Sequence, residues 1–414
     1  MRYIDFLDRK YRPKSSDIVC EFSVERNPKS PLSLNEIIGG IAAESSIGTW
    51  TSLTTEKEYM KHLAARVFEV KSNGNRARIK IAYPSELFEL NNIPNFMSSV
   101  AGNIFGLKDI QNLRLEDIHF PDPMIRHFKG PFYGIGGIRK ILKVYNRPLV
   151  GTIVKPKLGL RTKDHAKVAY DAWIGGCDIV KDDENLSSQH FNNFYDRLRE
   201  TVKMKKKAER ETGEKKIYMI NVTSETEEMI RRMRAVKAAG NEYAMVDILT
   251  IGWGGLQTVR TENEKLGLVL HAHRAGHAAF TKGKNGISMK VIAKLSRLIG
   301  MDQLHIGAIV GKMGETEEEV MGNHSACVGK MGNLKKVFSV CSGGVQPGLV
   351  PAIVKYFGND VIIQMGGGIH GHPWGTVSGA MAARQAVEAS VKKISLKEYS
   401  KTHRELAEAL KHFK

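Results

Sequence analysis

From residue 149 onward, short apolar segments alternate with helical segments, and this alternation limits the fold more than any other feature of the chain. The apolar segments are 149–156, 177–184, 217–223, 243–250, 267–274, 303–310, 337–344 and 361–368. Successive segments begin 24 to 40 residues apart, which leaves room for a strand, a loop and a helix each time. Eight strands that alternate with helices favour a closed parallel (β/α)8 TIM barrel, an α/β fold, over an open sheet.

The first 120 residues follow a different order. Strands are expected at 17–25, 65–71, 76–84 and 112–120, and helices at 34–46 and 93–105, with Ser33 as an N-cap. The β-α-β-β-α-β order is typical of a ferredoxin-like α+β domain. Prolines and glycines between 121 and 137 mark a change of domain. We therefore expect an N-terminal domain over 1–130 and a catalytic barrel domain over 131–414.

The charge balance indicates an anionic partner. Lys and Arg number 62 against 44 Asp and Glu, for a net charge of +18. Nucleic acid, an acidic surface and a phosphorylated small molecule all fit that charge. The basic run 203–207, followed by Lys215 and Lys216, has no interleaved aromatic residues, so a solvated helix face is a better interpretation than a nucleic-acid stripe.

Composition excludes several other classes. The four cysteines have no Cys-x-x-Cys spacing, so we expect neither a zinc site nor a disulfide framework. The N-terminus mixes charged and apolar residues, unlike a secretory signal, and no uninterrupted apolar run is long enough to span a membrane. A cytoplasmic protein without a membrane or nucleic-acid partner is expected.

Polar residues gather where the eight apolar segments end. In a barrel these carboxyl ends meet on one face, which is where barrel enzymes place their active sites. The residues concerned include Lys155, Lys157, Lys181, Asp183, Glu184, His273, Arg274, His305, Ser342, Gly343, Gly344, Gly366 and Gly367.

The tetrapeptide 181–184 (KDDE) is the most informative of these ends. On a strand, Lys181 and Asp183 share one face, and Glu184 can turn inward as the strand finishes. Two carboxylates at a barrel mouth suit Mg²⁺, which prefers oxygen ligands. A simple salt bridge between the lysine and the acids is an equally good interpretation.

Two further groups carry candidate chemistry. Lys155 and Lys157 are two residues apart, and crowding would lower the pKa of at least one of them, although a solvated basic loop is also possible. His273, Arg274 and His305 offer a phosphate fork beside imidazoles. Glycines after the last two strands fit phosphate binding as well as tight turns.

Five stretches closely resemble the large subunit of ribulose-1,5-bisphosphate carboxylase/oxygenase (RuBisCO), of the archaeal form III type. They are AESSIGTW (43–50), GTIVKPKLGL (151–160), GGCDIVKDDE (175–184), HAHRAGHAAF (271–280) and GGGIHGHPWG (366–375). The resemblance extends over nearly the whole chain.

The resemblance implies a role for each catalytic residue. Lys181 would react with CO2 to form an activating carbamate, which with Asp183 and Glu184 would hold Mg²⁺. Lys155 would assist enolisation and protonate the final carbanion, with Lys157 tuning it. His273 would transfer protons during hydration and cleavage. Lys312, in the mobile sixth loop, would orient the incoming CO2.

The resemblance also implies how substrate is bound. Arg274 and His305 would bind one phosphate with Ser342 and Gly343 nearby, and Gly344, Gly366, Gly367, Thr49 and Trp50 would bind the other. Glu44, Thr49, Trp50 and Asn103 would complete the barrel site of a partner subunit. A homodimer or an assembly of dimers is therefore expected, with no small subunit required.

The implied activity is Mg²⁺-dependent carboxylation of ribulose 1,5-bisphosphate to two molecules of 3-phosphoglycerate, with an oxygenase side activity, in nucleotide (AMP) salvage. The sixth loop departs from the family pattern after Lys312, where Met313, Gly314 and Glu315 follow. That departure motivates an alternative: enolase, isomerase or decarboxylase chemistry on another sugar phosphate. A degenerate, nucleic-acid-binding barrel is the remaining and weakest hypothesis.

Overall fold

The structure is a computed structural model that describes residues 1–312 and 314–413. The chain divides into two compact units. One contains Met1–Lys129 together with Gly276–Leu298 and Lys330–Leu334. The other contains Gly130–Ala275, Ile299–Gly329 and the chain from Lys335 onward. The boundary near residue 130 stays a prediction.

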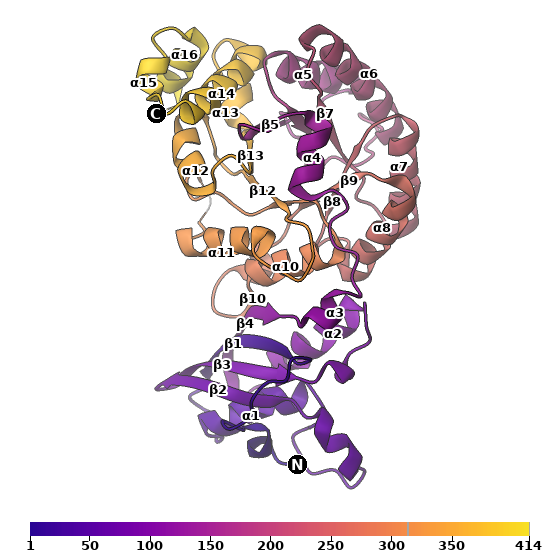
Figure 1. Cartoon of the computed structure of the whole chain (residues 1–414), viewed down its shortest axis with the longest axis vertical. Helices are drawn as coiled ribbons and strands as arrows, with labels where there is room; N and C mark the ends of the chain where they lie inside the picture. Colours follow the sequence, from indigo (N-terminus) through magenta and orange to yellow (C-terminus); the bar gives the residue numbers. More distant parts are fainter. Residues whose placement is uncertain (313, 414) are drawn as a thin grey trace. The chain divides into compact units, whose positions relative to one another are not determined.

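Within the described residues, eight parallel strands close into a barrel in the second unit, as the sequence predicts (Figure 1). Around the barrel the order is β11-β12-β13-β5-β6-β7-β8-β9. The strands are short and almost fully buried, as expected for strands that are covered on both faces. The strands are β5 (Leu149–Ile153), β6 (Ile179–Lys181), β7 (Ile217–Asn221), β8 (Tyr243–Asp247), β9 (Val269–His273), β11 (Gln303–His305), β12 (Phe338–Cys341) and β13 (Val361–Gln364).

Helices follow the strands and surround the barrel (Figure 1). The helix α7 illustrates how they pack, with Met229, Ile230, Met233 and Val236 buried on one side of the helix. The helices of this unit are α4 (Gly134–Leu142), α5 (Thr162–Ile174), α6 (Phe194–Thr212), α7 (Thr226–Ala238), α8 (Gly252–Leu266), α11 (Glu317–Val328), α12 (Val350–Phe357), α13 (Gly367–His370), α14 (Gly375–Val391), α15 (Leu396–Tyr399) and α16 (Arg404–His412).

The amino-terminal end of the barrel is closed by α4. Ile135, Ile138 and Leu142 of this helix pack in one cluster with strand residues such as Leu149 and Ile217. The Asp302 carboxylate, just before β11, accepts hydrogen bonds from the backbone N–H groups of Tyr133 (2.6 Å) and Gly134 (2.8 Å), which fixes the start of the helix. Because this end is filled, the carboxyl ends of the strands are left for a site.

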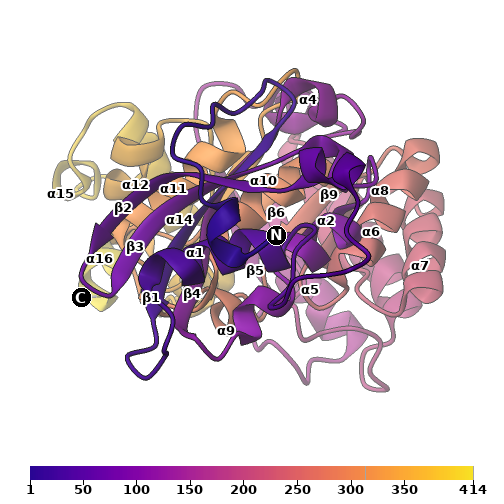
Figure 2. The same cartoon turned by 90° about the horizontal axis from the view of Figure 1, so that it is seen from below.

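The first unit contains a five-stranded sheet over its described residues, in the order β10-β4-β1-β3-β2. Its strands are β1 (Ile18–Arg26), β2 (Arg66–Asn73), β3 (Arg76–Tyr83), β4 (Ile110–His119) and β10 (Gly286–Ile287). All pairings are antiparallel except that of β10 with β4. Strands β2 and β3 form an antiparallel hairpin (Figure 2), in which Asn73 pairs with Arg76 across Gly74, whose φ is +58°.

The helices of the first unit are α1 (Leu34–Glu44), α2 (Ile93–Val100), α3 (Asp122–Ile125), α9 (Ala278–Thr281) and α10 (Met289–Ile299), with short 3₁₀ turns such as η1 (Tyr3–Phe6) and η4 (Asn103–Gly106). Ser33 caps α1 as predicted, in a capping box with Glu36. Gly39 of α1 lies against η1: a Cβ there would come within 2.0 Å of the Tyr3 carbonyl oxygen. Only glycine lets the two segments approach so closely.

One sequence interpretation is wrong in part. The basic run on α6 is not uniformly solvated, because Lys205 is buried and its Nζ lies 2.5 Å from Glu242 Oε2. Lys216 is also buried, and its Nζ donates to Glu214 (2.8 Å) and to the Cys177 carbonyl (3.2 Å). Lys205 follows Leu198 and Val202 on the inward stripe of α6, so helical spacing places it in the interior, where a carboxylate must balance its charge.

Candidate active site

The predicted barrel residues do lie at strand ends. Lys181, His273 and His305 are the last residues of β6, β9 and β11. Lys155, Ser342 and Gly366 follow β5, β12 and β13 within one or two residues. Because parallel strands end at the same rim, these side chains share one face of the barrel.

Lys181 lies among acidic groups in the interior. Its side chain is 1 % exposed, and its Nζ is 3.7 Å from Glu184 Oε2 and donates to the Asp182 carbonyl at 2.8 Å. Burial lowers the pKa of Lys181, although the surrounding carboxylates oppose that shift. Burial alone would raise the pKa of Glu184, but Lys181 and His273 hold it below its usual value. The site therefore holds an ionised carboxylate beside an amine that loses its proton more readily than an ordinary lysine.

Lys155 and Lys157, expected to crowd each other, have different partners. Lys155 Nζ donates to Asp183 Oδ2 at 2.7 Å, whereas Lys157 Nζ donates to Asn185 Oδ1 at 3.1 Å and lies on the exposed side. Gly366 lies beside Lys155, since a Cβ at that position would be 3.2 Å from Lys155 Cε. Lys155 is thus the lysine placed next to the acidic groups.

The donor set suits a divalent cation under one condition. Asp183 and Glu184 supply carboxylate oxygens, but the Nζ atoms of Lys155 and Lys181 now neutralise them. A cation would compete poorly with two ammonium groups. If Lys181 became a carbamate, its positive charge would turn into an oxygen anion, and the group would offer anionic oxygen ligands, the kind that Mg²⁺ prefers.

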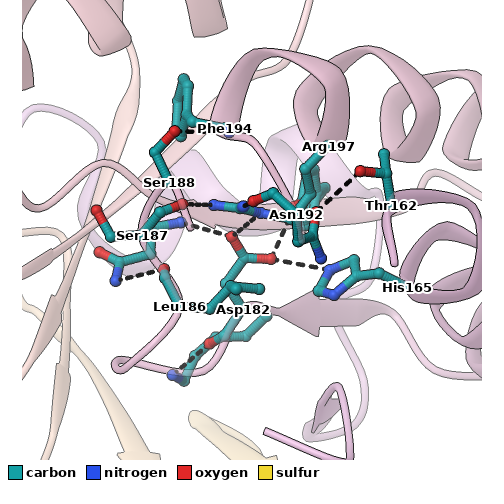
Figure 3. A network of polar contacts seen from close by, with 12 residues as sticks. Thr162, His165, Asp182, Leu186, Ser187, Ser188, Asn192, Phe194 and Arg197 are labelled. Atoms are coloured by element: carbon teal, nitrogen blue, oxygen red, sulfur yellow. Dashed lines mark hydrogen bonds and ion pairs between the residues drawn. The ribbon is translucent and has the colours of Figure 1, made fainter. Parts of the chain in front are cut away.

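Asp182 faces His165 of α5 and Arg197 of α6, two helices outside the barrel (Figure 3). Its carboxylate is fully buried and accepts from Tyr218 Oη (2.7 Å), Arg197 Nε (3.0 Å) and the Asn221 N–H (3.1 Å). Although burial would raise its pKa, Arg197 and His165 hold the pKa of Asp182 far below its usual value. The strand end is therefore charged on both faces.

His273 has two acidic neighbours. Its Nδ1 lies 2.6 Å from Asp247 Oδ1, and its Nε2 lies 3.5 Å from Glu184 Oε2. Because a carboxylate only accepts hydrogen bonds, Nδ1 carries a proton and donates it toward Asp247. We did not predict Asp247 from the sequence, although it is the last residue of β8 and the strand-end rule would have found it.

A second chain of contacts joins β9, β11 and β12. His271 Nδ1 lies 2.8 Å from Gln303 Oε1, and the Nε2 atoms of His271 and His305 are 3.0 Å apart. His305 Nδ1 lies 2.8 Å from Ser342 Oγ. Burial lowers the pKa of both imidazoles well below the usual value, so both are neutral near pH 7. Both ring nitrogens of His305 are engaged.

Arg274 is occupied by a residue of the sixth loop. Both of its terminal nitrogens donate to the carboxylate of Glu315. The exposed Lys312 starts from the same loop, and its backbone N–H donates to the Gly343 carbonyl at 3.1 Å. Gly344 has a φ of +77°, and a Cβ there would come within 2.7 Å of the Lys312 nitrogen. This glycine is thus needed for packing against the loop. Met313 lies outside the described residues.

Comparisons with known proteins decide the family. The family model for the ribulose bisphosphate carboxylase large chain, catalytic domain, matches residues 134–413. The model for the N-terminal domain of the same chain matches residues 5–124. The chain belongs to the RuBisCO large-chain family.

Several archaeal members of the RuBisCO family are similar to this chain over nearly its whole length. The ribulose bisphosphate carboxylase of Methanosarcina mazei is 50% identical, over 98% of both chains, and that of Pyrococcus furiosus is 45% identical, over 99% of this chain and 97% of the relative. The octameric RuBisCO of Pyrococcus horikoshii, solved with sulfate, has a TM-score of 0.96 and 43% identity, covering 100% of this chain and 97% of that one. The dimeric RuBisCO of Hyperthermus butylicus has a TM-score of 0.92 and 43% identity, covering 99% and 98%.

Four residues expected at the RuBisCO site lie in the other unit. Glu44 ends α1, is half-buried, and accepts a hydrogen bond from Tyr3 Oη at 2.7 Å. Thr49 and Trp50 follow that helix, and Trp50 is 80% exposed. Asn103 begins η4 and is exposed. Trp50 and Asn103 are therefore exposed, whereas Glu44 and Thr49 are half-buried.

A separate group of metal-type ligands lies on the sheet of the first unit. Single ligand atoms of Glu21, Asp117 and His119 lie within 4.8 Å of one another. The Nζ atoms of Lys290 and Lys294 contact Asp117 at 2.6 and 2.5 Å. Ammonium groups balance Asp117 just as they balance Asp183 and Glu184, so charge alone does not choose between the two groups; residues 181–184 remain the candidate metal site because they end a strand of the catalytic domain matched by the family model. Among the described helices, none is long and apolar enough to cross a membrane.

Proposed function

We propose that this chain is a Mg²⁺-dependent ribulose-1,5-bisphosphate carboxylase that converts ribulose 1,5-bisphosphate, CO2 and water into two molecules of 3-phosphoglycerate. One observation carries the proposal: in a chain of the RuBisCO family, the buried Lys181 lies 3.7 Å from Glu184, next to Asp183 and its partner Lys155. Burial of the Lys181 amine at the strand-end face, together with the family, favours this interpretation over a simple salt bridge.

Activation starts with the amine of Lys181. In its neutral form the nitrogen attacks the carbon of CO2, a C–N bond forms, and one proton leaves to solvent. The lowered pKa of Lys181 favours this step, because only the unprotonated amine is a nucleophile. The resulting carbamate oxygens, Asp183 and Glu184 would hold Mg²⁺. When bound, the cation polarises the substrate's carbonyl and hydroxyl oxygens and stabilises negative charge.

The other residues move protons and place the substrate. Lys155 would transfer protons during enolisation and after cleavage, and Lys157 would add positive charge beside it. His273 presents a basic Nε2 that Asp247 orients. Lys312 would close over the substrate and orient CO2.

The phosphates would be bound at two groups of residues. Arg274 and His305 take one phosphate, with Ser342 and Gly343 beside them, and the backbone N–H groups of Gly344, Gly366 and Gly367 take the other together with Thr49 and Trp50. Glu44, Thr49, Trp50 and Asn103 act on the barrel of a second copy. A homodimer or an assembly of dimers is therefore the working unit, without a need for a small subunit.

An oxygenase side activity follows from the same chemistry, because O2 can react with the carbanion form of the enediolate. We place the enzyme in the cytoplasm, in the salvage of nucleotides such as AMP. No nucleic-acid or membrane partner is part of the proposal.

The deciding experiment incubates the purified protein with isotope-labelled CO2, Mg²⁺ and ribulose 1,5-bisphosphate. Label should appear in 3-phosphoglycerate with the wild-type chain. Lys181→Ala should give a folded protein with neither activity nor CO2-dependent activation. Absence of label from a folded, CO2- and Mg²⁺-treated wild type would refute the carboxylase proposal.

A second candidate is enolase, isomerase or decarboxylase chemistry on another sugar phosphate. The sixth loop favours it, because Gly314 and the Arg274-bound Glu315 follow Lys312 in a pattern unlike that of the family. This candidate predicts exchange of a substrate C–H proton with solvent, without incorporation of CO2.

A further inference from the structure

A buried ionic network lies directly behind the metal-type carboxylates, on the outer side of β6. Figure 3 shows Arg197, from α6, and His165, from α5, converging on the carboxylate of Asp182. His165 Nε2 lies 3.1 Å from Asp182 Oδ1 without the alignment of a hydrogen bond. The side chains of Asp182 and Arg197 are 0% exposed.

The chemistry of this network is unusual for its location. The space between barrel strands and their helices is normally filled with apolar side chains, and buried charge pairs give little net stability over well-packed apolar residues. A charged pair there is therefore better explained by the geometry that it enforces. Directional contacts fix an orientation, whereas apolar packing tolerates small rotations.

Arg197 ties together both ends of the segment that follows β6. Its Nε donates to Asp182, its Nη1 to the carbonyl of Asn192 (2.8 Å) and its Nη2 to the carbonyl of Ser187 (2.6 Å). One rigid guanidinium thus spans residues 182 to 192, the stretch that contains Asp183 and Glu184.

Asn221, at the end of β7, holds the same segment from the neighbouring strand. Its backbone N–H donates to Asp182 Oδ2 at 3.1 Å. Its side-chain amide donates to the carbonyls of Glu184 (3.0 Å) and Leu186 (3.1 Å). The backbone of Glu184 is therefore fixed on one side while its carboxylate faces Lys181 on the other.

We propose that Asp182 and Arg197 are positioning residues for the two carboxylates that hold the metal in the proposed function. Neither contacts the metal or the substrate. They set the direction of the chain at Asp183 and Glu184, so that both carboxylates face the same point as the modified Lys181. Their role depends on the proposed function, in which these acids bind Mg²⁺.

Three variants test this role at different strengths. Asp182→Asn removes the charge with little change of shape, Arg197→Lys keeps the charge but loses the fork, and Tyr218→Phe removes only one hydroxyl that donates to Asp182. The matched control is Asp178→Asn at the amino end of the same strand. Asp178 is as buried as Asp182 and is bound by Arg147 through two contacts of 2.6 and 2.7 Å, but it precedes β6, whereas Asp182 follows it.

Mg²⁺ binding to the full-length protein is measured by calorimetric titration without substrate, once in the presence and once in the absence of saturating bicarbonate. A urea unfolding curve gives the stability of each variant. Asp182→Asn and Arg197→Lys should raise the Mg²⁺ Kd about 10- to 100-fold, the usual effect of losing partners that orient metal ligands. Tyr218→Phe should raise it by a smaller factor. Asp178→Asn should leave the Mg²⁺ Kd unchanged even where it lowers the stability as much.

The outcomes separate the two proposals. If the wild type shows no bicarbonate-dependent Mg²⁺ binding, the proposed function fails. If the wild type binds but the network variants retain its Kd, or if Asp178→Asn weakens binding equally, the positioning role is refuted. Should Asp182→Asn not fold, Arg197→Lys and the mild Tyr218→Phe still decide the result.

Discussion

Arg274 binds the carboxylate of Glu315 through both terminal guanidinium nitrogens, across 41 residues of sequence. The pair is largely buried, with the two side chains 6% and 16% exposed. Gly307, whose φ is +92°, makes room for it, since a Cβ there would lie 2.5 Å from Glu315 Oε2. In the proposed function Arg274 binds a substrate phosphate. Glu315 therefore takes the place of that phosphate and must leave when the substrate arrives.

Replacing Glu315 with Gln should tighten phosphate binding. The variant removes the competing negative charge but keeps the shape of the side chain. We expect the Kd for inorganic phosphate and the KM for ribulose bisphosphate to fall about 5- to 30-fold, the change that one or two kcal/mol produces. Calorimetry with phosphate and steady-state kinetics would measure the two quantities.

The control for this experiment is Glu317→Gln at the start of α11. Glu317 is nearby in sequence but accepts from Tyr356 Oη at 3.0 Å and does not contact Arg274. It should leave phosphate binding unchanged. Weaker phosphate binding by Glu315→Gln would show instead that Glu315 orients Arg274 for the substrate.

Lys155→Arg should separate proton transfer from metal binding. The arginine keeps a cation beside Asp183 but does not release a proton near neutral pH. We expect kcat to fall about 10²- to 10⁴-fold, the usual contribution of a general acid–base group. Bicarbonate-dependent Mg²⁺ binding should persist, and the exposed Lys163→Arg should behave as the wild type. Near-normal turnover would remove Lys155 from the catalytic group.

The barrel could be predicted from the sequence, because the regular spacing of the apolar segments indicates where its strands lie. Every one of the eight segments contains a barrel strand, and the strand-end rule leads to Lys181 and His273. Asp247 obeys the same rule, but a single acid at the end of the run 243–250 stands out less than the KDDE stretch. The rule finds rim residues and does not rank them.

Contacts between distant elements are harder to predict. The alternation of side chains along a strand places Asp182 on the face opposite to Lys181. Its partners Arg197 and Tyr218 lie on other elements, and the local sequence pattern does not predict how those elements pack against Asp182. The lysine-rich composition of α6 predicts a solvated face, although Lys205 lies on the inward stripe of the helix. The positive charge of Lys205 is balanced by Glu242, which the sequence does not place beside it. In both cases the missing information is which opposite charge the fold brings to the buried one.

The buried imidazoles predict how stability changes with pH. Burial holds the pKa of His271 and His305 well below 6.5, so the folded chain stays unprotonated at these rings while the unfolded chain takes up protons below pH 6.5. The free energy of unfolding should therefore fall between pH 7.5 and 5.5, by about 1.4 kcal/mol per ring. Urea unfolding at both pH values measures it.

His271→Gln should reduce the fall in the free energy of unfolding between pH 7.5 and 5.5, because it removes one of the two buried imidazole rings. His62→Gln serves as the control, since the His62 side chain is 58% exposed in the folded chain and its removal should keep the wild-type slope. An unchanged pH dependence in His271→Gln would mean that this ring is protonated in the folded protein.

The last prediction concerns the contribution of a second chain to the site. The variants Glu44→Gln and Lys181→Ala should each be inactive alone. The first lacks the Glu44 carboxylate of the N-terminal domain, and the second lacks the lysine that is activated by CO2. If Glu44 acts on the partner's barrel, a mixed dimer holds one intact site and one doubly defective site. With random pairing, co-expression should restore about one quarter of the wild-type activity.

The arrangement of the defects makes this result specific. If each chain completed its own site, every site in the mixture would contain one defect, and co-expression would restore nothing. Co-expression of Lys181→Ala with Lys155→Arg is the matched control, because both defects lie in the barrel unit and no pairing of chains yields an intact site. The 80% exposure of Trp50, next to the predicted substrate residue Thr49, favours restoration, since a large aromatic side chain at a substrate site needs a surface to cover it.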